Sequence, residues 1–134
     1  MKISFVVIDE SELDCFIAGR IIHKYDCEAP VYFFNEAQAA LDVISANGLT
    51  PEGLIIILLD LQMPLMDGYG FIKKFEANGL NAADKYHIAV LSATVDPRDL
   101  NRLRSLASVK MIIQKPLSPD KIKALIQHLK VGSS

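Results

Sequence analysis

Five short apolar runs alternate along the chain with longer segments in which apolar residues recur at helical spacing. The runs cover residues 3–8, 31–34, 54–59, 88–91 and 111–113. Their alternation with helical segments is typical of a parallel sheet that is covered by helices on both faces. The third run, Leu54 to Leu59, is apolar without interruption, so we predict that it forms the central strand.

Apolar residues spaced three and four positions apart predict which face of each helix packs on the sheet. In the first helical segment this face consists of Leu13, Ile17, Ile21 and Tyr25. In the second it consists of Ala37, Ala40, Leu41 and Ile44. In the last it consists of Ile122, Leu125, Ile126 and Leu129. We expect each of these faces to be buried against the sheet.

Capping residues indicate where the helices begin. Ser118 is a suitable N-cap and Pro119 suits the first helical position, which predicts a helix from about Pro119 to Lys130. Asp96 followed by Pro97 predicts the start of the fourth helix in the same way. Together with the apolar runs, these signals predict five strands and five helices.

The second helix and the connection after the third helix carry weaker local signals. Asn35, with Gln38 three residues later, resembles a capping box for the second helix. Residues 77–85 contain Asn78-Gly79 and Asn81, which are turn-forming residues. We therefore expect this segment to be a loop.

The composition agrees with one globular domain and excludes several classes of protein. The chain has 134 residues, of which 51% are hydrophobic and 22% charged. It contains neither a membrane-spanning apolar run nor a signal-peptide layout, so we expect a cytoplasmic protein that is not bound to a membrane. The net charge is −2 without a basic cluster, which argues against direct nucleic-acid binding. The two cysteines and three histidines match no metal or redox spacing.

Polar side chains follow four of the five predicted strands at the point where each strand ends. Asp9 and Glu10 follow the first strand, Asp60 the third, Ser92 the fourth, and Lys115 the fifth. Ligands of open parallel sheets bind outside the carboxyl ends of the strands. We therefore expect three carboxylates, a hydroxyl and an ammonium group to meet at one edge of the sheet.

This combination of groups favours phosphoryl transfer assisted by Mg²⁺. Three neighbouring carboxylates repel one another unless a cation joins them, and Mg²⁺ prefers carboxylate and phosphate oxygens. An aspartate can itself be the nucleophile that accepts a phosphoryl group. The sequence has no Walker-type loop and no histidine placed to activate a Ser or Cys nucleophile, so it does not favour a nucleoside triphosphatase or a hydrolase.

The sequence LLDLQMPLMDG from Leu58 to Gly68 resembles that of response-regulator receiver domains. Asp9-Glu10 before it, and Ser92-Ala93 and Lys115-Pro116 after it, also match this family. The resemblance implies a flavodoxin-like, doubly wound α/β fold, in which a five-stranded parallel sheet of order 2-1-3-4-5 is flanked by five helices. We assign residues 1–131 to the receiver domain, and the terminal Gly-Ser-Ser at residues 132–134 predicts a short flexible tail.

The resemblance also implies a role for each residue of the predicted site. Asp60 would be the phosphoacceptor, and Mg²⁺ would be held by Asp9, Glu10, Asp60 and the backbone carbonyl of Gln62. Glu10 stands where a second Asp is more usual, which lengthens the arm toward the metal by one methylene.

Three residues in or just after the fourth and fifth strands are implied to take part in signalling. Ser92 would be the switch hydroxyl, and Lys115 would pair with the phosphoryl group. Lys115 precedes Pro116 through a bond that is usually cis in this family. Ile112 stands where many members carry a Tyr or Phe that moves inward on phosphorylation.

The function implied is that of a stand-alone signalling protein rather than an enzyme. A sensor histidine kinase or a histidine phosphotransfer protein would phosphorylate Asp60, and the product would slowly lose its phosphate without help. A downstream protein would bind the fourth helix, fifth strand and fifth helix, roughly residues 97–130. The short tail and Met1 favour a complete protein.

Two alternatives remain open from the sequence. Glu10 and Ile112 would suit a pseudo-receiver that binds a partner without phosphorylation. The chain could also be the receiver fragment of a hybrid kinase or transcription factor. A phosphatase with an Asp nucleophile is not favoured, because Asp9-Glu10-Ser11 does not match the DxDx[TV] pattern of such enzymes.

Overall fold

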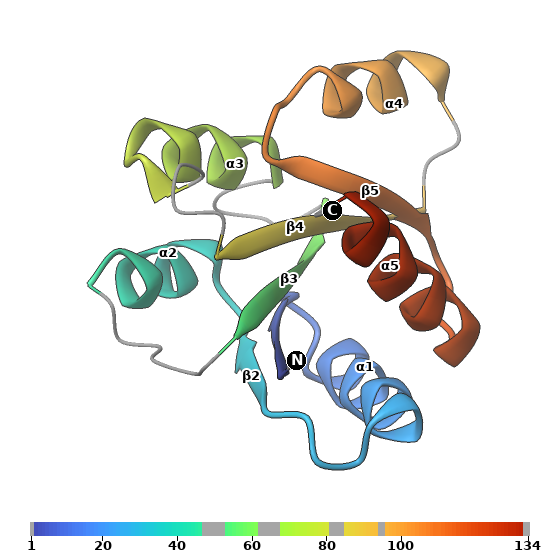
Figure 1. Cartoon of the computed structure of the whole chain (residues 1–134). Coiled ribbons are helices and arrows are strands. Elements are labelled where there is room, and N and C mark those ends of the chain that lie inside the picture. The colour runs from blue at the N-terminus through green and yellow to red at the C-terminus, as the bar shows by residue number, and fades with distance from the viewer. Residues whose placement is uncertain (1, 47–52, 62–67, 81–84, 94–95, 133–134) are drawn as a thin grey trace.

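A parallel five-stranded sheet with helices on both faces forms the protein, as a computed structural model shows (Figure 1). The structure describes residues 2–46, 53–61, 68–80, 85–93 and 96–132. The strands are β1 (Ile3–Ile8), β2 (Val31–Phe34), β3 (Leu54–Asp60), β4 (Tyr86–Ser92) and β5 (Val109–Gln114). The helices are α1 (Glu12–Tyr25), α2 (Ala37–Ser45), α3 (Gly68–Ala77), α4 (Pro97–Arg104) and α5 (Pro119–Gly132).

The strand order is β2-β1-β3-β4-β5, and every neighbouring pair is parallel. This confirms the predicted flavodoxin-like fold and the predicted central position of the third strand. The structure extends β3 to Asp60, and it lengthens β4 and β5 by one to two residues at each end relative to the apolar runs. Strand ends are less apolar than strand centres, so hydrophobicity alone underestimates strand length.

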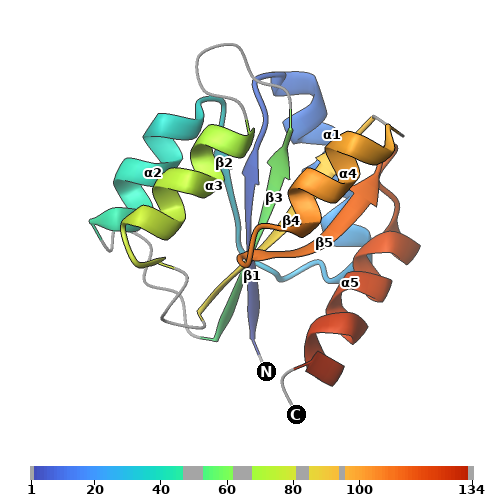
Figure 2. The same ribbon diagram turned by 90° about the horizontal axis from the view of Figure 1, so that it is seen from above.

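Two hydrophobic clusters, one on each face of the sheet, form the core. Ile55, Ile57 and Leu59 of β3 pack on the side of α2, α3 and α4. Ile56 and Leu58 pack on the side of α1 and α5. Figure 1 shows α1 and α5 on one face, and Figure 2 shows α2 and α3 side by side on the other. Because β3 is covered on both faces, its sequence is apolar without alternation.

The predicted buried face of α1 is wrong. Leu13 and Ile17 are 66% and 45% exposed, and Tyr25 is also exposed, whereas Ile21 is only partly buried. The helix instead packs on the sheet through Cys15, Ala18, Gly19 and Ile22. These side chains are mostly small, so the helix lies close to the strands. The larger apolar residues form a second, exposed stripe that periodicity could not distinguish from the buried one.

The predicted buried faces of α2 and α5 are confirmed. In α2 the buried residues are Ala37, Ala40, Leu41 and Ile44. In α5 they are Ile122, Leu125, Ile126 and Leu129. In both helices a single apolar stripe is present, so the helical period identifies the buried face without ambiguity.

The caps of α4 and α5 agree with the sequence, whereas that of α2 does not. Asp96 accepts a hydrogen bond from the Arg98 backbone N–H at 2.9 Å, and Ser118 Oγ accepts one from the Lys121 N–H at 3.2 Å. The capping box predicted for α2 is wrong, because its N-cap is Glu36, which makes no side-chain capping bond. The Asn35 amide instead donates a hydrogen bond to the Asp9 carbonyl.

Two predicted irregular segments are described only in part. Gly79 follows α3 with φ of 73°, a conformation that glycine adopts readily, whereas residues 81–84 of the predicted loop lie outside the described residues. At the carboxyl end, α5 reaches Gly132, so it includes the first residue of the predicted tail. Among the helices that the structure describes, none is long and apolar enough to cross a membrane.

Candidate functional site

Side chains from four strand ends line one polar hollow at the carboxyl edge of the sheet. Asp9 follows β1, Asp60 ends β3, Ser92 ends β4 and Lys115 follows β5. They line a hollow of about 240 Å³, together with Glu10. Parallel strands bring their carboxyl ends to the same edge, and β1, β3, β4 and β5 are consecutive neighbours. The five side chains predicted from the sequence are therefore brought together.

Asp60 and Lys115, which both line this hollow, form an ion pair. The distance from Lys115 Nζ to Asp60 Oδ1 is 3.1 Å. The Asp60 side chain is 10% exposed and that of Lys115 is 32% exposed, so one side of the pair faces solvent. The carboxylate is thus accessible to a reactant while its charge is partly compensated.

The backbone that directly follows Asp60 is fixed by hydrogen bonds. The Leu61 N–H donates to the Leu91 carbonyl at 3.2 Å, and the Gly68 N–H donates to the Leu61 carbonyl at 2.9 Å. An added Cβ on Gly68 would lie 3.0 Å from the Leu61 Cα, so this approach favours glycine. Residues 62–67, which include Gln62, lie outside the described part of the chain.

Asp9 is a buried carboxylate whose ionisation is unfavourable. Its side chain belongs to a residue that is 3% exposed, and Oδ1 accepts a hydrogen bond from the Ser11 N–H at 3.0 Å. Burial raises the pKa of Asp9, and the negative charges of Asp60 and Asp14 raise it further, while the Ser11 hydrogen bond and Lys115 lower it. A cation placed beside Asp9 would relieve this unfavourable charge.

The main chain of Asp9 is held from two neighbouring elements. Its carbonyl accepts hydrogen bonds from Asn35 Nδ2 at 3.1 Å and from the Cys15 thiol at 3.4 Å. Its N–H donates to the Phe34 carbonyl at 3.0 Å. Asn35 therefore ties the end of β2 to the site rather than capping α2, which is the physical reason that the capping prediction is wrong.

The loop that carries Lys115 is also tied down. The Lys115 N–H donates to the Ser92 carbonyl at 2.9 Å, and the Lys115-Pro116 bond is cis, as the family resemblance implied. Lys121 Nζ donates to the Gln114 and Pro116 carbonyls at 2.7 and 2.6 Å. Carbonyls on both sides of Lys115 are therefore bound by one ammonium group from α5.

The two residues that the resemblance linked to switching lie at different depths. Ser92 is 2% exposed and lines the hollow beside Asp60 and Lys115. Ile112, on β5, is partly buried and packs against the hydrophobic cluster on the side of α3 and α4. A branched aliphatic side chain thus occupies the position at which the sequence resemblance implied that an aromatic ring is common.

The donor chemistry of the hollow suits Mg²⁺. Among the described residues, no group of three or more His, Cys, Asp and Glu side chains is close enough to hold a metal ion. Mg²⁺ is commonly bound by one or two carboxylates while it retains several waters. The buried Asp9 and its neighbour Asp60 fit this pattern, with exposed Glu10 at the rim. The donor chemistry therefore fits the ion.

Asp14 lines the same hollow, although we did not select it from the sequence. It lies in the first turn of α1, where its N–H donates to Ser11 Oγ at 3.1 Å and its charge raises the pKa of Asp9. The signal was present, because Ser11 is an N-cap and an acidic residue three positions later faces back toward the start of the helix.

The sequence matches the family model described as the response regulator receiver domain over residues 5–127. A comparison with curated protein sequences finds no match. Solved structures with similar folds include a response regulator receiver protein from Dyadobacter fermentans, which has a TM-score of 0.81 and 25% identity, with 96% of this chain and 98% of that chain covered.

Two further solved structures support the comparison. A two-component response regulator from Cytophaga hutchinsonii has a TM-score of 0.82 and 25% identity, with coverage of 97% of this chain and 98% of that one. The chemotaxis protein CheY4 from Vibrio cholerae shares the fold, with a TM-score of 0.73 at 18% identity and coverage of 96% and 99%. The family model covers nearly the whole sequence, so the chain belongs to the response regulator receiver domain family of two-component signalling.

Proposed function

We propose that this receiver domain accepts a phosphoryl group on Asp60 in a Mg²⁺-dependent reaction and signals through a change in conformation. The observation that carries the proposal is the ion pair at 3.1 Å between Asp60 and Lys115, beside the buried carboxylate Asp9. Asp60 is accessible enough to react, and its neighbours carry the charges that phosphoryl transfer requires.

The proposed donor is a phosphohistidine on a sensor histidine kinase or a histidine phosphotransfer protein. One oxygen of the Asp60 carboxylate forms a bond to phosphorus, while the bond from phosphorus to the imidazole nitrogen breaks. The electron pair of the broken bond leaves with the imidazole, which takes up a proton from solvent. The product is an acyl phosphate on Asp60.

Asp9, Asp60 and Glu10 would hold the Mg²⁺, with the carbonyl of Gln62 as a further oxygen ligand. When bound, the ion would neutralise the negative charge of the phosphoryl oxygens and of the carboxylates. Lys115 would bind another phosphoryl oxygen through its ammonium group. With both cations present, an incoming phosphoryl group would not meet a net negative site.

Slow loss of phosphate is expected to reset the domain. Water attacks phosphorus, the bond between phosphorus and the Asp60 oxygen breaks, and inorganic phosphate leaves. The receiver domain family is a signalling family, so we propose that the chain acts as a signalling domain rather than as an enzyme.

The proposed output is a shift in conformational population that a downstream protein recognises. Ser92 would form a hydrogen bond to the phosphoryl group, and Ile112 would adjust its packing on the neighbouring strand. The α4-β5-α5 surface would then bind the target. Arg98 is highly exposed on this surface, whereas the Arg102 guanidinium lies 3.9 Å from the centre of the Tyr69 ring and links α4 to α3.

The proposal can be tested with a small-molecule phosphodonor and Mg²⁺. Intact mass spectrometry should detect one added phosphoryl group on the wild type and none on Asp60→Asn. Asp14→Asn is the matched control, because Asp14 lines the same hollow without contacting Lys115 in the described contacts. No adduct on the wild type, or an equal adduct on Asp60→Asn, would overturn the proposal and favour a pseudo-receiver.

A further inference from the structure

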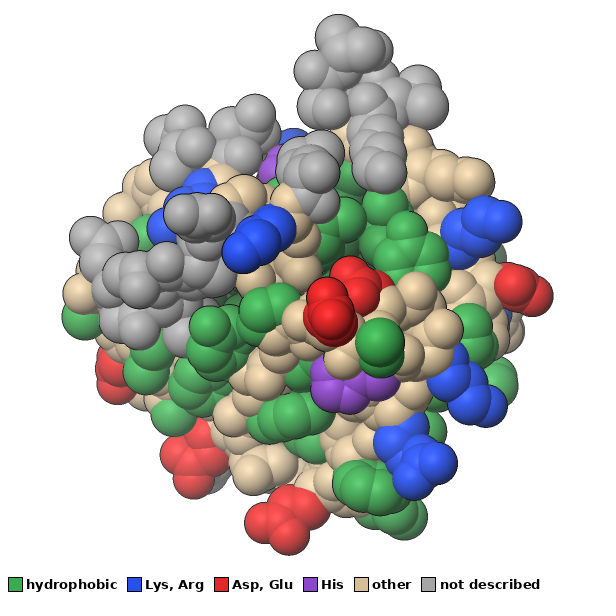
Figure 3. Space-filling view, turned by 60° about the horizontal axis from the view of Figure 1, so that its bottom comes forward, with side chains coloured by type: hydrophobic (Ala, Val, Ile, Leu, Met, Phe, Trp, Pro, Cys, Tyr) green, Lys and Arg blue, Asp and Glu red, His purple; other side chains and the backbone are tan. Residues whose placement is uncertain are grey.

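The exposed large hydrophobic side chains of the described residues all lie on α1 and β2. They are Leu13, Phe16, Ile17, Tyr25 and Phe33. Figure 3 shows hydrophobic side chains, coloured green, exposed between acidic and basic ones on the lower face of Figure 1. Soluble domains rarely leave neighbouring apolar side chains of this size in water unless the surface binds something.

A groove runs between α1 and the edge strand β2 on this side of the sheet. It has a volume of about 470 Å³, and its α1 wall consists of Glu12, Cys15, Phe16, Gly19, Arg20 and His23. These positions recur at steps of three and four, so they form one continuous helix face about three turns, or roughly 16 Å, long. The opposite wall is formed by Phe33 and Asn35 of the β2 end.

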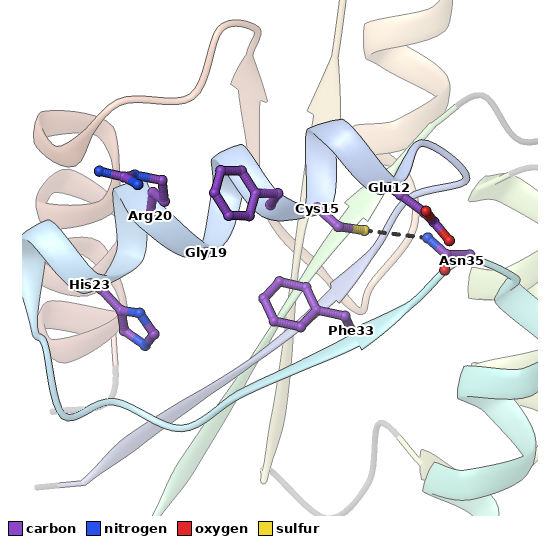
Figure 4. A pocket seen from close by; sticks show the side chains of 8 residues that line it. Glu12, Cys15, Gly19, Arg20, His23, Phe33 and Asn35 are labelled. Carbon is purple, nitrogen blue, oxygen red and sulfur yellow. Dashed lines mark hydrogen bonds between the residues drawn. The ribbon is translucent and has the colours of Figure 1, made fainter.

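The groove lies on the face of the sheet that has fewer helices. Among the described residues, α1 and α5 cover this face, whereas α2, α3 and α4 cover the opposite one. The Phe33 side chain points from β2 toward Gly19 (Figure 4) and remains 46% exposed. A Cβ on Gly19 would lie 2.8 Å from the Phe33 ring, so the ring rests against the helix backbone. The ring therefore provides an exposed apolar floor beside α1, which a further helix could cover from outside.

The charges at the two ends of the groove indicate which helix fits. Glu12 and Asn35 lie at one end, and Arg20 and His23 lie at the other (Figure 4). A helix that runs antiparallel to α1 and carries the same charges would place acid against base at both ends. The same helix in a parallel orientation would place like charges together. The charges along α1 are therefore complementary to those of a second, antiparallel α1.

We propose that the occupant is α1 of a second copy of this chain, in a two-fold symmetric dimer. Glu12 and Arg20 each lie four residues from Phe16, so an axis near Phe16 places Glu12 of each copy opposite Arg20 of the other. The Phe16 rings meet at the axis, and each added helix covers the Phe33 ring of the other copy. The interface is isologous, because the same surface is used twice.

The dimer is tested by sedimentation of the full chain over a wide concentration series, without Mg²⁺ or phosphodonor. Its failure would therefore leave the proposed chemistry at Asp60 untouched. Wild type should show a reversible monomer–dimer equilibrium, and Phe16→Glu should raise the dimer Kd roughly tenfold or more. Ala39→Glu, which adds the same charge to an exposed position of α2, is the matched control and should leave the Kd unchanged.

Charge reversal distinguishes a second copy from any other occupant. Glu12→Arg alone and Arg20→Glu alone should each weaken the dimer, whereas the two changes together should restore it. Both side chains are exposed, so far-ultraviolet circular dichroism should confirm that every variant is folded. The double variant should regain dimerisation only if Glu12 of one copy faces Arg20 of the other.

Crosslinking detects the dimer directly, without a substitution that is meant to weaken it. In a Cys27→Ser background, which removes the exposed native thiol, Phe16→Cys should crosslink readily to a second copy with a short bis-maleimide. Ala39→Cys in the same background should not. A monomeric wild type at every concentration, a dimer unaffected by Phe16→Glu, or the absence of charge-reversal rescue would each overturn the proposal.

Discussion

Replacement of Lys115 by methionine tests whether this lysine compensates the buried carboxylates. Lys115→Met keeps an unbranched side chain of similar length and removes the ammonium group that lies 3.1 Å from Asp60 Oδ1. Asp9 and Asp60 then remain buried next to each other without that positive charge. The folded state should lose stability, because the unfolded chain hydrates both carboxylates.

The magnitude follows from the burial of the pair. Breaking a fully buried ion pair by removal of one partner costs about 3–5 kcal/mol, whereas an exposed pair contributes at most about 1 kcal/mol. The Lys115 side chain is 32% exposed and that of Asp60 is 10% exposed, so water screens the pair in part. We therefore expect the free energy of unfolding to fall by roughly 1–2 kcal/mol at neutral pH.

The sign of the pH dependence follows from Asp9. Its pKa is already raised in the folded state, and Lys115 is one of the groups that lower it, so Lys115→Met raises it further. A carboxyl with a raised folded-state pKa binds its proton more tightly in the folded than in the unfolded state. Stability therefore falls as pH rises from the ordinary aspartate pKa of about 3.8 through the raised value, and it levels off above. The loss of unfolding free energy in Lys115→Met should therefore grow over the same pH range.

Urea unfolding at several pH values measures the effect, with Lys123→Met, at an exposed position of α5, as the control. Addition of Mg²⁺ should restore more stability to Lys115→Met than to the wild type, because the ion replaces the missing positive charge. At a Mg²⁺ concentration of 100 Kd, binding to the folded state alone contributes about 2.7 kcal/mol. Equal losses in the two lysine variants, or a loss that does not depend on pH, would refute the reasoning.

Three further predictions use other parts of the site. Asp9→Asn should increase the free energy of unfolding at neutral pH, because it removes a carboxylate whose pKa is raised by burial. This gain in stability should disappear near pH 3.8. In the same urea assay, the variant should be stabilised less by Mg²⁺ than the wild type. Lys121→Met should cost about 1 kcal/mol and slow phosphorylation by a small-molecule donor, because it frees the two carbonyls beside Lys115; unchanged kinetics would argue against a positioning role. The buried thiol of Cys15, with a pKa of about 11, should react with a thiol reagent at pH 8 far more slowly than exposed Cys27, and two equally fast thiols in the native protein would contradict this.

The strands and the members of the site could be predicted because they depend on strong, local signals, whereas the strand order followed only from the family resemblance. An uninterrupted apolar run such as Leu54–Leu59 identifies a strand that is buried on both faces. The polar residue that follows each run then lies at the carboxyl edge of the sheet by the geometry of parallel strands alone. Asp60 and Lys115 meet in space for this reason, although 54 residues separate them in the sequence.

The buried face of α1 could not be predicted, because the helix carries two apolar stripes. Leu13 and Ile17 are larger than Cys15 and Ala18, and size favours them as core residues. The structure buries the smaller pair, since small side chains allow the helix to lie close to the sheet. Which stripe is buried depends on the distance between layers, which periodicity does not contain. The exposed stripe with Leu13 and Ile17 lies on α1 next to the proposed dimer groove.

The role of Asn35 could not be predicted for a different reason. Its spacing from Gln38 satisfies the pattern of a local capping box, yet its amide donates to the Asp9 carbonyl, 26 residues away in the sequence. A long-range hydrogen bond replaces the local one because the end of β2 lies beside the end of β1 in the sheet. Local patterns predict helix caps well only where no neighbouring element offers a better partner.

The central claim is that Asp60, among all the carboxylates of the site, receives the phosphoryl group. The most direct measurement is borohydride reduction of the protein after treatment with a phosphodonor and Mg²⁺, followed by peptide mass spectrometry, because borohydride converts an aspartyl phosphate to homoserine. We predict homoserine at position 60, dependent on both the donor and Mg²⁺. Homoserine at position 9 or 14 instead, or at no position, would contradict the account.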